Sequence, residues 1–450
     1  MELDQIVQQV QTAVENNDWQ QGMELLRPLP IPDLAYVLCE CDPDTALNFF
    51  RRYPALEQSS IFGYLRPAMQ SDLAEIMSRS ELTELFALMD HDERADLYNR
   101  LSEEERLNIL PGLAHAERED IRTLASYEEG TAGAIMTSAY ISLSEKLTAS
   151  QALQSIREEA PDAETIYQIY IVDNKRKLIG TISLRDLLLA PPNTKLNEIM
   201  VTDVIHCQVN DPQSDAAHSI AHYDLISLPV VDDKDRLVGI ITHDDALDVT
   251  QEESTDDQMR LGAVDGAPTM SLKEATIGML YRMRVFWLVI LVFGNVFSGA
   301  GIAYFENLIE SMVALVFFLP LLVDSGGNAG SQSATLMVRA LATGEVRMRD
   351  WFQMLSKEIT VALLLGLSMA AAVSLVGLMR GGVILAVIVA TTMVLIVMVG
   401  SIIGMSLPFV LTRFKMDPAS ASAPLITSIC DAVGVLIYFN VANLLLDMPT

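Results

Sequence analysis

The sequence contains few of the residues that build zinc sites, disulfides and nucleophilic active sites. Among 450 residues there are six histidines and four cysteines (Cys39, Cys41, Cys207 and Cys430), with no Cys-x-x-Cys pair. We therefore expect neither a zinc site nor a disulfide framework, and the thiols fit a reducing compartment. The histidines and cysteines cluster nowhere with the carboxylates of the apolar half, so we do not expect an enzyme.

An excess of positive charge and an apolar N-terminal segment are also lacking. The chain starts Met-Glu-Leu-Asp-Gln, so no signal peptide is expected and the soluble part should stay in the cytosol. The net charge is −29, yet nine basic and nine acidic residues cancel from Thr276 onward, so residues 1–275 carry the whole excess. A strongly acidic soluble half favours cations as partners and argues against nucleic acid.

Residues 1–125 predict an all-α domain of helical hairpins. Segments such as 72–77 and 82–89 place apolar residues three and four apart, which is typical of amphipathic helices. Prolines divide the segment into short helices with tight connections, and stacked hairpins are the expected result. These prolines are Pro28, Pro30, Pro32, Pro43, Pro54, Pro67 and Pro111.

Residues 126–250 contain an internal repeat. The segment 169–186 aligns with 228–245, Gly180 and Gly239 are 59 residues apart, and Met136-Thr recurs near Met200. Each copy predicts a strand, a charged turn, a second strand and a helix, and the two copies should bury each other's apolar face. The pattern resembles an α/β tandem CBS pair.

Adenine nucleotides are the ligands that such a pair often binds. Arg185 and Asp186 stand where a contact to ribose or phosphate would lie, so the resemblance implies a possible ATP site. The alternative is that these two residues only begin a helix.

A strongly acidic segment follows the repeat. Residues 244–257 contain seven acids and no base, and on a helix several of these acids fall three or four residues apart. Like charges at that spacing destabilise an isolated helix, so bound cations would favour this one. Magnesium and calcium prefer such carboxylate oxygens. We predict an acidic connecting helix within 251–275, with a helix over 272–281 leading onward; an exposed linker is the alternative.

The rest of the chain, residues 276–450, predicts a transmembrane domain of five helices. Each apolar run exceeds the ~20 residues that cross a bilayer. Basic residues follow the second and fourth runs and precede the first, so the N-terminus is expected inside and the C-terminus outside the plasma (inner) membrane. The runs cover about 285–305, 308–342, 358–379, 382–412 and 419–446.

The second run is interrupted by the segment 320–332, Pro-Leu-Leu-Val-Asp-Ser-Gly-Gly-Asn-Ala-Gly-Ser-Gln. Irregular backbone in a membrane survives only inside protein or along a water-filled route. We therefore expect this segment to shape the wall of a polar path. The alternative is a kinked helix whose small residues allow close packing.

Asp431 lies midway along the last apolar run. An ionised carboxylate there costs several kcal/mol unless it faces water, a partner charge or an ion. No mid-span Lys or Arg is available to pair with it, whereas Thr427 is close on the same helix. A protonated Asp hydrogen-bonded between helices is the alternative. In a dimer, two such carboxylates would face one pore and attract a hydrated divalent cation.

The order of these segments and their motifs resemble the MgtE family of magnesium channels. The resemblance covers the whole chain and implies a homodimeric, magnesium-selective channel that cytosolic magnesium holds shut. It implies a pore site at Asp431 with Asn328 and Thr427, and a path shaped by Pro320, Gly326, Gly327, Gly330 and Gln332. It also implies regulatory magnesium at Asp90, Asp245, Asp248, Glu253, Asp256 and Asp257.

Two other transport classes remain open at the level of sequence. An anion channel with CBS domains would require basic or amide-lined selectivity, whereas the mid-membrane charge here is acidic. A proton- or sodium-coupled divalent metal exchanger is compatible with an intramembrane Asp, which also suits a proton relay.

Overall fold

The structure is a computed structural model that describes residues 3–103, 106, 109–264 and 275–446. The chain divides into two compact units, Met1–Glu253 and Ser254–Thr450, and each unit is described by itself. Part of the predicted connecting helix over 251–275, and the start of the helix predicted over 272–281, lie outside the described residues.

The first part of unit 1 is a stack of short helices whose boundaries follow the prolines. Helices α4 and α6 begin at Pro43 and Pro67, and Pro30 and Pro54 precede α3 and α5. Proline is favoured at these starts because its missing N–H has no intrahelical partner there anyway. The helices are α1 (Leu3–Glu15), α2 (Trp19–Leu26), α3 (Ile31–Cys39), α4 (Pro43–Phe50), α5 (Ala55–Gly63), α6 (Pro67–Ile76), α7 (Arg79–Leu88), α8 (His91–Arg100) and α10 (His115–Leu124).

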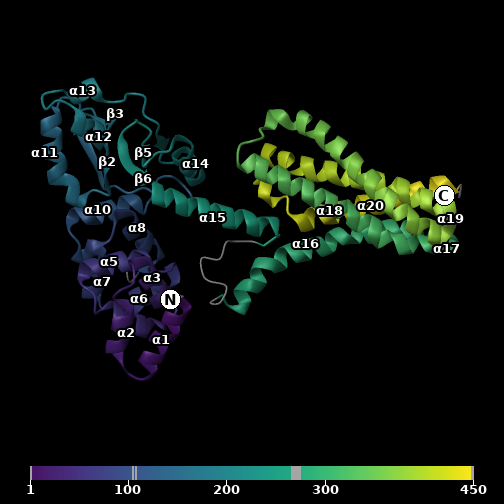
Figure 1. Ribbon diagram of the computed structural model, residues 1–450, viewed down its shortest axis with the longest axis horizontal. Coiled ribbons are helices and arrows are strands. Elements are labelled where there is room, and N and C mark those ends of the chain that lie inside the picture. Colours follow the sequence, from purple (N-terminus) through teal and green to yellow (C-terminus); the bar gives the residue numbers. More distant parts are fainter. Residues whose placement is uncertain (1–2, 104–105, 107–108, 265–274, 447–450) are drawn as a thin grey trace. The chain divides into compact units, whose positions relative to one another are not determined.

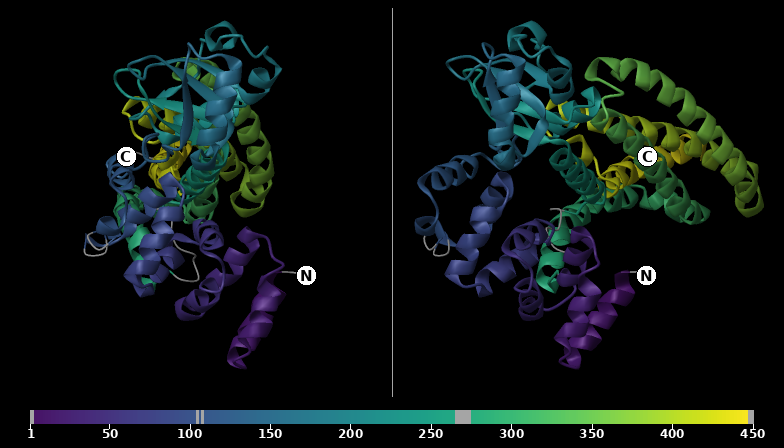
Figure 2. Two further views of the ribbon diagram at one scale, coloured as in Figure 1. Left: turned by 90° about the vertical axis from the view of Figure 1, so that its left-hand side faces the viewer. Right: turned by 60° about the vertical axis from the view of Figure 1, so that its left-hand side comes forward.

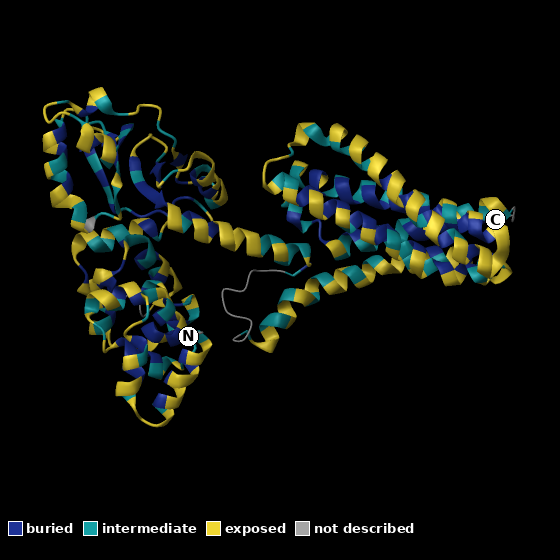
Figure 3. Cartoon of the chain, viewed as in Figure 1, coloured by how far each residue is buried: buried dark blue, intermediate teal, exposed yellow. Residues whose placement is uncertain are grey.

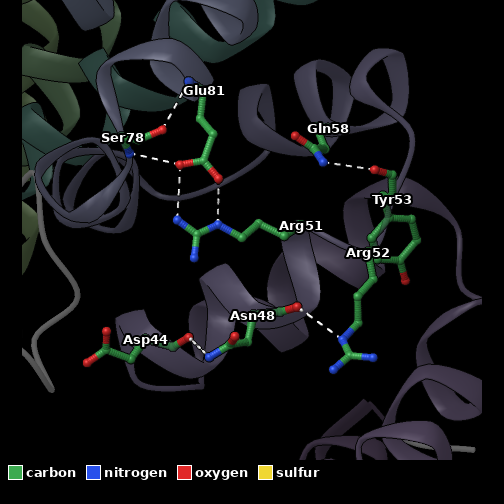
Figure 4. Close-up of polar contacts among 8 residues, drawn as sticks. All are labelled: Asp44, Asn48, Arg51, Arg52, Tyr53, Gln58, Ser78 and Glu81. Carbon is green, nitrogen blue, oxygen red and sulfur yellow. Dashed lines mark hydrogen bonds and ion pairs between the residues drawn. The ribbon is translucent and has the colours of Figure 1, made fainter.

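An ion pair joins two of these helices across the stack. Arg51, which follows α4, donates two hydrogen bonds of 2.7 and 3.0 Å to Glu81 in the first turn of α7 (Figure 4). Ser78 caps α7 and donates its backbone N–H to the same carboxylate. The hydrogen bonds from Arg51 lower the pKa of Glu81 to about 2. The pair therefore links the end of α4 to the start of α7 while Glu81 is ionised.

The second part of unit 1 contains two sheets of identical topology, as the internal repeat predicted (Figure 1). In each sheet the first strand pairs parallel with the second, and the second pairs antiparallel with the third. The first copy comprises β1 (Tyr140–Ser144), α11 (Ala149–Glu159), β2 (Thr165–Val172), β3 (Leu178–Ser183), α12 (Leu184–Leu189) and α13 (Leu196–Ile199). The second comprises β4 (Cys207–Gln208), α14 (Gln213–Tyr223), β5 (Ser227–Val231), β6 (Leu237–Thr242) and α15 (His243–Leu261).

The repeated glycines and methionines form equivalent contacts. A Cβ on Gly180 would lie 2.7 Å from the Met200 sulfur, and one on Gly239 would lie 2.8 Å from Met136 Cγ. Each strand therefore lacks a side chain where a repeated methionine covers it. The two copies also bond to each other, because the Tyr170 hydroxyl contacts the Ser227 hydroxyl at 2.7 Å.

Unit 2 consists of long apolar helices that lie side by side (Figures 1 and 2). Among the residues that the structure describes, three helical segments are long and apolar enough to cross a membrane: Ile277–Tyr304, Met348–Arg413 and Ala423–Leu446. Large apolar side chains of α16, such as Phe293 and Phe297, are exposed, as expected of a surface that faces lipid (Figure 3). The elements are α16 (Ile277–Tyr304), α17 (Glu306–Ser311), α18 (Ala314–Ala342), η3 (Met348–Asp350), α19 (Trp351–Arg413), η4 (Pro418–Ser420) and α20 (Ala423–Leu446).

Helix α19 is a hairpin of two helical arms. Its backbone leaves helical geometry at Gly381 and Gly382, and Gly382 has a φ of 76°, which a residue with a Cβ rarely adopts. The arms touch, because a Cβ on Gly377 would lie 2.7 Å from the Ala386 Cα and one on Gly366 would lie 3.0 Å from the Val394 Cα. The apolar runs predicted over 358–379 and 382–412 are these two arms.

The expectation of irregular backbone at 320–332 is wrong, because α18 is helical throughout from Ala314 to Ala342, with Pro320 inside it. Its glycines serve close packing instead. A Cβ on Gly330 would lie 2.8 Å from the Gly400 carbonyl oxygen, and one on Gly404 would collide with the Gly330 carbonyl. Gly326 and Gly330 on α18 thus meet Gly400 and Gly404 on α19, and this contact brings two backbones together.

Replacing Gly404 with Ala should destabilise unit 2. The new methyl group has no space against the α18 backbone, and overpacking of this kind costs on the order of 1–3 kcal/mol. Thermal unfolding of the purified protein in detergent would show a lower midpoint. Gly299→Ala on α16 is the matched control, because a Cβ there meets no atom of the described residues within 4 Å. Equal midpoints for the two variants would contradict the packing argument.

Candidate cation sites

A seam of polar side chains runs between α18 and α20. On α18, Asn328 donates a 3.0 Å hydrogen bond from its side-chain amide to Asp324, one helical turn away. Farther along the same face, the Ser331 hydroxyl lies 3.5 Å from the Thr427 hydroxyl of α20. Asp431 follows Thr427 by one turn of α20 and is partly exposed. The seam therefore collects two carboxylates, an amide and two hydroxyls between apolar helices.

Contacts between the two helices place Asp324 at the level of Asp431. A Cβ on Gly327 would lie 2.9 Å from Thr427 Cγ2, and a Cβ on Gly434 would lie 3.8 Å from the Val323 Cα. Because the helices run antiparallel, residue 324 falls opposite the stretch between Thr427 and Gly434. The negative charge of Asp324 accordingly acts on Asp431. The sequence analysis names Asp431 but not Asp324 as a pore residue, and the proximity of the two depends on the packing of two separate helices.

The other residues predicted to shape the path have different surroundings. Gly326 and Gly330 are buried against α19, and Gly327 packs on Thr427. Pro320 lies in the apolar first half of α18, and Gln332 is exposed. The three glycines set helix spacing. The seam itself is made by Asp324, Asn328, Ser331, Thr427 and Asp431.

A second group of carboxylates lies in unit 1, where α8 approaches the start of α15. Asp92 and Glu93 on α8 lie in the field of Asp245 on α15. Glu164, just before β2, adds its charge to Glu93. We name Asp90, Asp92, Glu93, Glu164, Asp244, Asp245 and Asp248 the acidic cluster. Of the acids at α8, the sequence analysis names only Asp90, and it gives no signal for Glu164, which is distant in the chain.

Burial and mutual repulsion raise the pKa values of several carboxyl groups in this cluster. Burial, followed by the charge of Asp245, raises the pKa of Asp92 well above its usual range. Burial, followed by the charge of Asp92, raises the pKa of Glu93 to about 8. The pKa of Asp245 is also raised by burial, against the effect of a hydrogen bond from Thr242. The cluster therefore favours bound protons or cations over bare charge.

One carboxylate oxygen of the cluster stands apart from the local hydrogen bonds. Asp92 Oδ1 is buried and accepts no hydrogen bond within the part of the chain that the structure describes. Leaving such an oxygen unsatisfied is costly. Its neighbour His91 is bound, with Nδ1 2.7 Å from Asp120 on α10 and 2.7 Å from the Ser138 hydroxyl before β1. The local backbone is thus fixed while the Asp92 oxygen stays available to a cation.

Within the described residues, the acidic cluster does not form a closed metal cage. In residues 3–103, 106, 109–264 and 275–446, no three His, Cys, Asp or Glu side chains converge as direct ligands of one metal. Magnesium usually keeps several of its waters and takes one or two carboxylates directly. Carboxylates spaced around Asp92 could hold such an ion through its waters.

The predicted regulatory residues fall into two groups. Asp90, Asp245 and Asp248 belong to the acidic cluster. Asp256 lies ~16 Å along α15 from Asp245, at 1.5 Å per residue. There it pairs with Arg260 at 2.6 Å. Glu253 is exposed and Asp257 partly exposed on the same stretch. The acidic helix starts at His243, eight residues before the predicted boundary, because Thr242 and Asp245 interact at its start.

Arg185 and Asp186 lie in the first turn of α12. Ser183 caps that helix, and its hydroxyl is 2.7 Å from the Asp186 carboxylate and accepts the Asp186 N–H. Asp186 is the repeat equivalent of Asp245. Arg185 and Asp186 therefore begin a helix, which is the alternative that the sequence analysis gave to a nucleotide site. A ligand contact would be an additional role.

Comparison with known proteins matches three parts of the chain to family models. A family model described as a divalent cation transporter, MgtE, matches residues 319–441, and the MgtE intracellular N domain matches residues 29–130. CBS domains match residues 132–193 and 196–252. The magnesium transporter MgtE of Thermus thermophilus is 44% identical over 330 residues, which cover 73% of either chain. This chain belongs to the MgtE family.

Other relatives and solved structures agree with that membership. The MgtE magnesium transporters of Bacillus subtilis and Enterococcus faecalis are 32% and 34% identical, and each alignment covers 72% of this chain and 71% of the relative. The cytosolic domain of the Mg²⁺ channel MgtE in complex with ATP is 33% identical, with a TM-score of 0.51. It covers 54% of this chain and 99% of its own. The soluble part of a magnesium transporter is 30% identical, with a TM-score of 0.50. The match covers 56% of this chain and 100% of that structure's chain.

The acidic cluster predicts that unit 1 loses stability as pH rises. A carboxyl group whose pKa is raised by folding binds more protons folded than unfolded. Its stabilisation is full below the ordinary value of ~4.5 and is lost as pH rises to the folded value, which for Glu93 is about 8. Thermal unfolding of the full chain is measured in EDTA by the fluorescence of Trp19, in a background in which Trp287 and Trp351 are replaced by Phe. The unfolding midpoint should be lower at pH 8 than at pH 5.

Asp92→Asn should flatten this pH dependence and raise the midpoint at pH 8, because it removes one of the repelling charges. Magnesium added at pH 8 should stabilise the unaltered protein more than the variant. Asp72→Asn, at a position of α6 outside the cluster, is the control. An Asp92→Asn profile that superimposes on that of the control would rule out the cluster as the source.

Proposed function

We propose that this chain is a magnesium-selective channel that imports Mg²⁺ and is closed by cytosolic Mg²⁺. The observation that carries the proposal is the polar seam, in which Asp431 and Asp324 lie at one level between apolar helices. Carboxylates in a membrane mark an ion path, because they must face water, a partner charge or an ion. Two carboxylates with amide and hydroxyl oxygens suit a divalent cation that keeps part of its hydration shell.

The exposed side of the seam supports a homodimer. Asn328 and Thr335 are exposed along one face of α18, although the helices around them are apolar. In a bilayer these side chains would contact lipid unless water or a second copy covered them. We propose that a second copy faces this side across a two-fold axis, so that both Asp431 residues line one pore. The transmembrane domain then has five spans: α16, α18, the two arms of α19, and α20.

Magnesium control is proposed to act through the acidic cluster and α15. At low magnesium the cluster repels itself and favours separation of α8 from the start of α15. At high magnesium the ion neutralises these carboxylates and holds the two elements together. In this proposal the sensor is the helical domain 1–125, and the CBS pair is 126–250. The connecting helix lies within 251–275, and the pore domain is 276–450. The first three regions lie in the cytosol, and the C-terminus lies outside.

ATP is proposed as a ligand of the CBS pair. The support is the similarity to a cytosolic domain solved with ATP and the position of Arg185, whose guanidinium can bind phosphate. Asp186, next to it, offers a carboxylate to a ribose hydroxyl.

A cation-coupled exchanger is the second candidate function. Asp324 and Asp431 lie at one level of the helices, and an intramembrane carboxylate also suits a proton relay. Coupled transport would then move protons against magnesium, and a reversal potential that follows magnesium alone would exclude it.

Asp431→Ala should reduce magnesium uptake into proteoliposomes by at least about tenfold, since it removes the central charge of the path. Uptake is measured with a magnesium-sensitive dye at low internal magnesium. Glu306→Gln, at the start of α17 and outside the seam, is the control. Undiminished uptake by the Asp431 variant would remove the basis of the proposed function. Asp324→Asn should give a smaller loss, because it keeps the hydrogen bond with Asn328 but loses the second charge.

Replacing Asp248, Asp256 and Asp257 together with Ala should weaken inhibition by internal magnesium while leaving uptake at low magnesium intact. The three carboxylates attract the regulatory ion but lie outside the path. The half-inhibitory magnesium concentration is read from uptake at graded internal magnesium. Asp215, Asp233 and Asp235, replaced in the same way on the second CBS copy, give a control of equal charge. If both triple variants respond to magnesium as the unaltered protein does, regulation does not use α15.

A further inference from the structure

The last turn of α15 is fixed to the membrane domain by one arginine. Arg260 Nε lies 2.6 Å from Asp256 of the same helix, and its NH1 nitrogen lies 2.5 Å from Asp417, just before η4. All three side chains are partly shielded from water, with exposed fractions of 41% for Arg260, 24% for Asp256 and 34% for Asp417. One guanidinium thus binds two carboxylates from segments that are far apart in the sequence.

Apolar packing reinforces this ion pair. Leu261, the next residue, packs in a cluster with Ala419, Ile426 and Cys430, to which α18 contributes Ala334 and Val338. Ile426 and Cys430 belong to α20, and Cys430 is the residue before Asp431. Residues from Ser254 onward, which include the second half of α15, accordingly form one compact unit with the membrane helices. The end of the acidic helix therefore contacts the helix that carries the pore carboxylate.

Asp417 is held in place independently of Arg260. Its other oxygen accepts the Ala419 N–H at 2.8 Å and caps η4, directly ahead of α20. Arg260 therefore binds a carboxylate that is itself hydrogen-bonded to the backbone just before α20.

We propose that Arg260 is the positioning residue that couples the magnesium-sensing acids of α15 to the pore, by fastening the last turn of α15 to the Asp417 cap of α20. This inference rests on the proposed function. Arg260 lies outside the ion path and outside the acidic cluster. Its role is mechanical: magnesium bound along α15 changes the position of that helix, and the Arg260–Asp417 pair passes the change to α20.

The test is the full chain in proteoliposomes, with Mg²⁺ uptake measured over a range of internal magnesium. Arg260→Gln should raise the half-inhibitory magnesium concentration by about fivefold or more, the size of a typical coupling between sites. Uptake at low internal magnesium should not change, because the path is intact. Arg260→Lys keeps a cation and should stay closer to the unaltered protein. Arg349→Gln, at an exposed arginine before α19, is the matched control.

Asp417→Asn provides a second variant, since Asn preserves the cap on η4 but lacks the charge that binds Arg260. It should shift the half-inhibitory concentration as Arg260→Gln does, and the double variant should add little, because both changes break the same contact. Additive shifts, or unchanged inhibition in both single variants, would overturn the coupling role. If Asp431→Ala abolishes uptake in the same preparation, such a result leaves the proposed function standing.

Discussion

A carboxylate that is kept from bulk water requires a proton or a cation, and the proposed mechanism depends on this constraint at both ends of the chain. In unit 1 the constraint acts on Asp92, whose buried oxygen has no partner among the described residues, and on Glu93, whose pKa rises to about 8. In unit 2 it acts on Asp324 and Asp431, which share one level between apolar helices. The first arrangement responds to the concentration of a cation, and the second attracts a cation into a membrane.

Helix α15 is the element through which these two arrangements can communicate. It starts in the acidic cluster at Asp245 and ends at Leu261, which packs beside α20. A helix of 19 residues is ~28 Å long, and the proposed mechanism requires that it transmit a displacement. Its exposed acids make that displacement sensitive to charge, and Arg260 supplies the attachment at the far end. Close packing of Gly330 and Gly404 keeps the receiving bundle rigid.

Sequence patterns predicted the fold well wherever local rules decide the outcome. The prolines predicted the helix starts at Pro43 and Pro67, and the repeat predicted two sheets of one topology. The same reasoning was wrong about residues 320–332, because glycine, asparagine and proline in a membrane segment indicate either a broken helix or a tightly packed one. The decision lay with Gly400 and Gly404, which are distant in the sequence and lie against the backbone of α18.

The candidate sites divide in the same way. Sequence alone determined that Asp431 needs water or an ion, since it is an acid within an apolar span that has no basic residue to pair with it, and that residues 244–257 attract cations. Only the tertiary structure decided which acids stand together: Asp324 with Asp431, and Asp92 and Glu93 with Asp245. It also decided that Arg260, next to Asp256 on α15, binds Asp417, which is far away in the chain. The physical reason is that the cost of a charge depends on its burial and neighbours, and both are set by contacts between helices far apart in the chain.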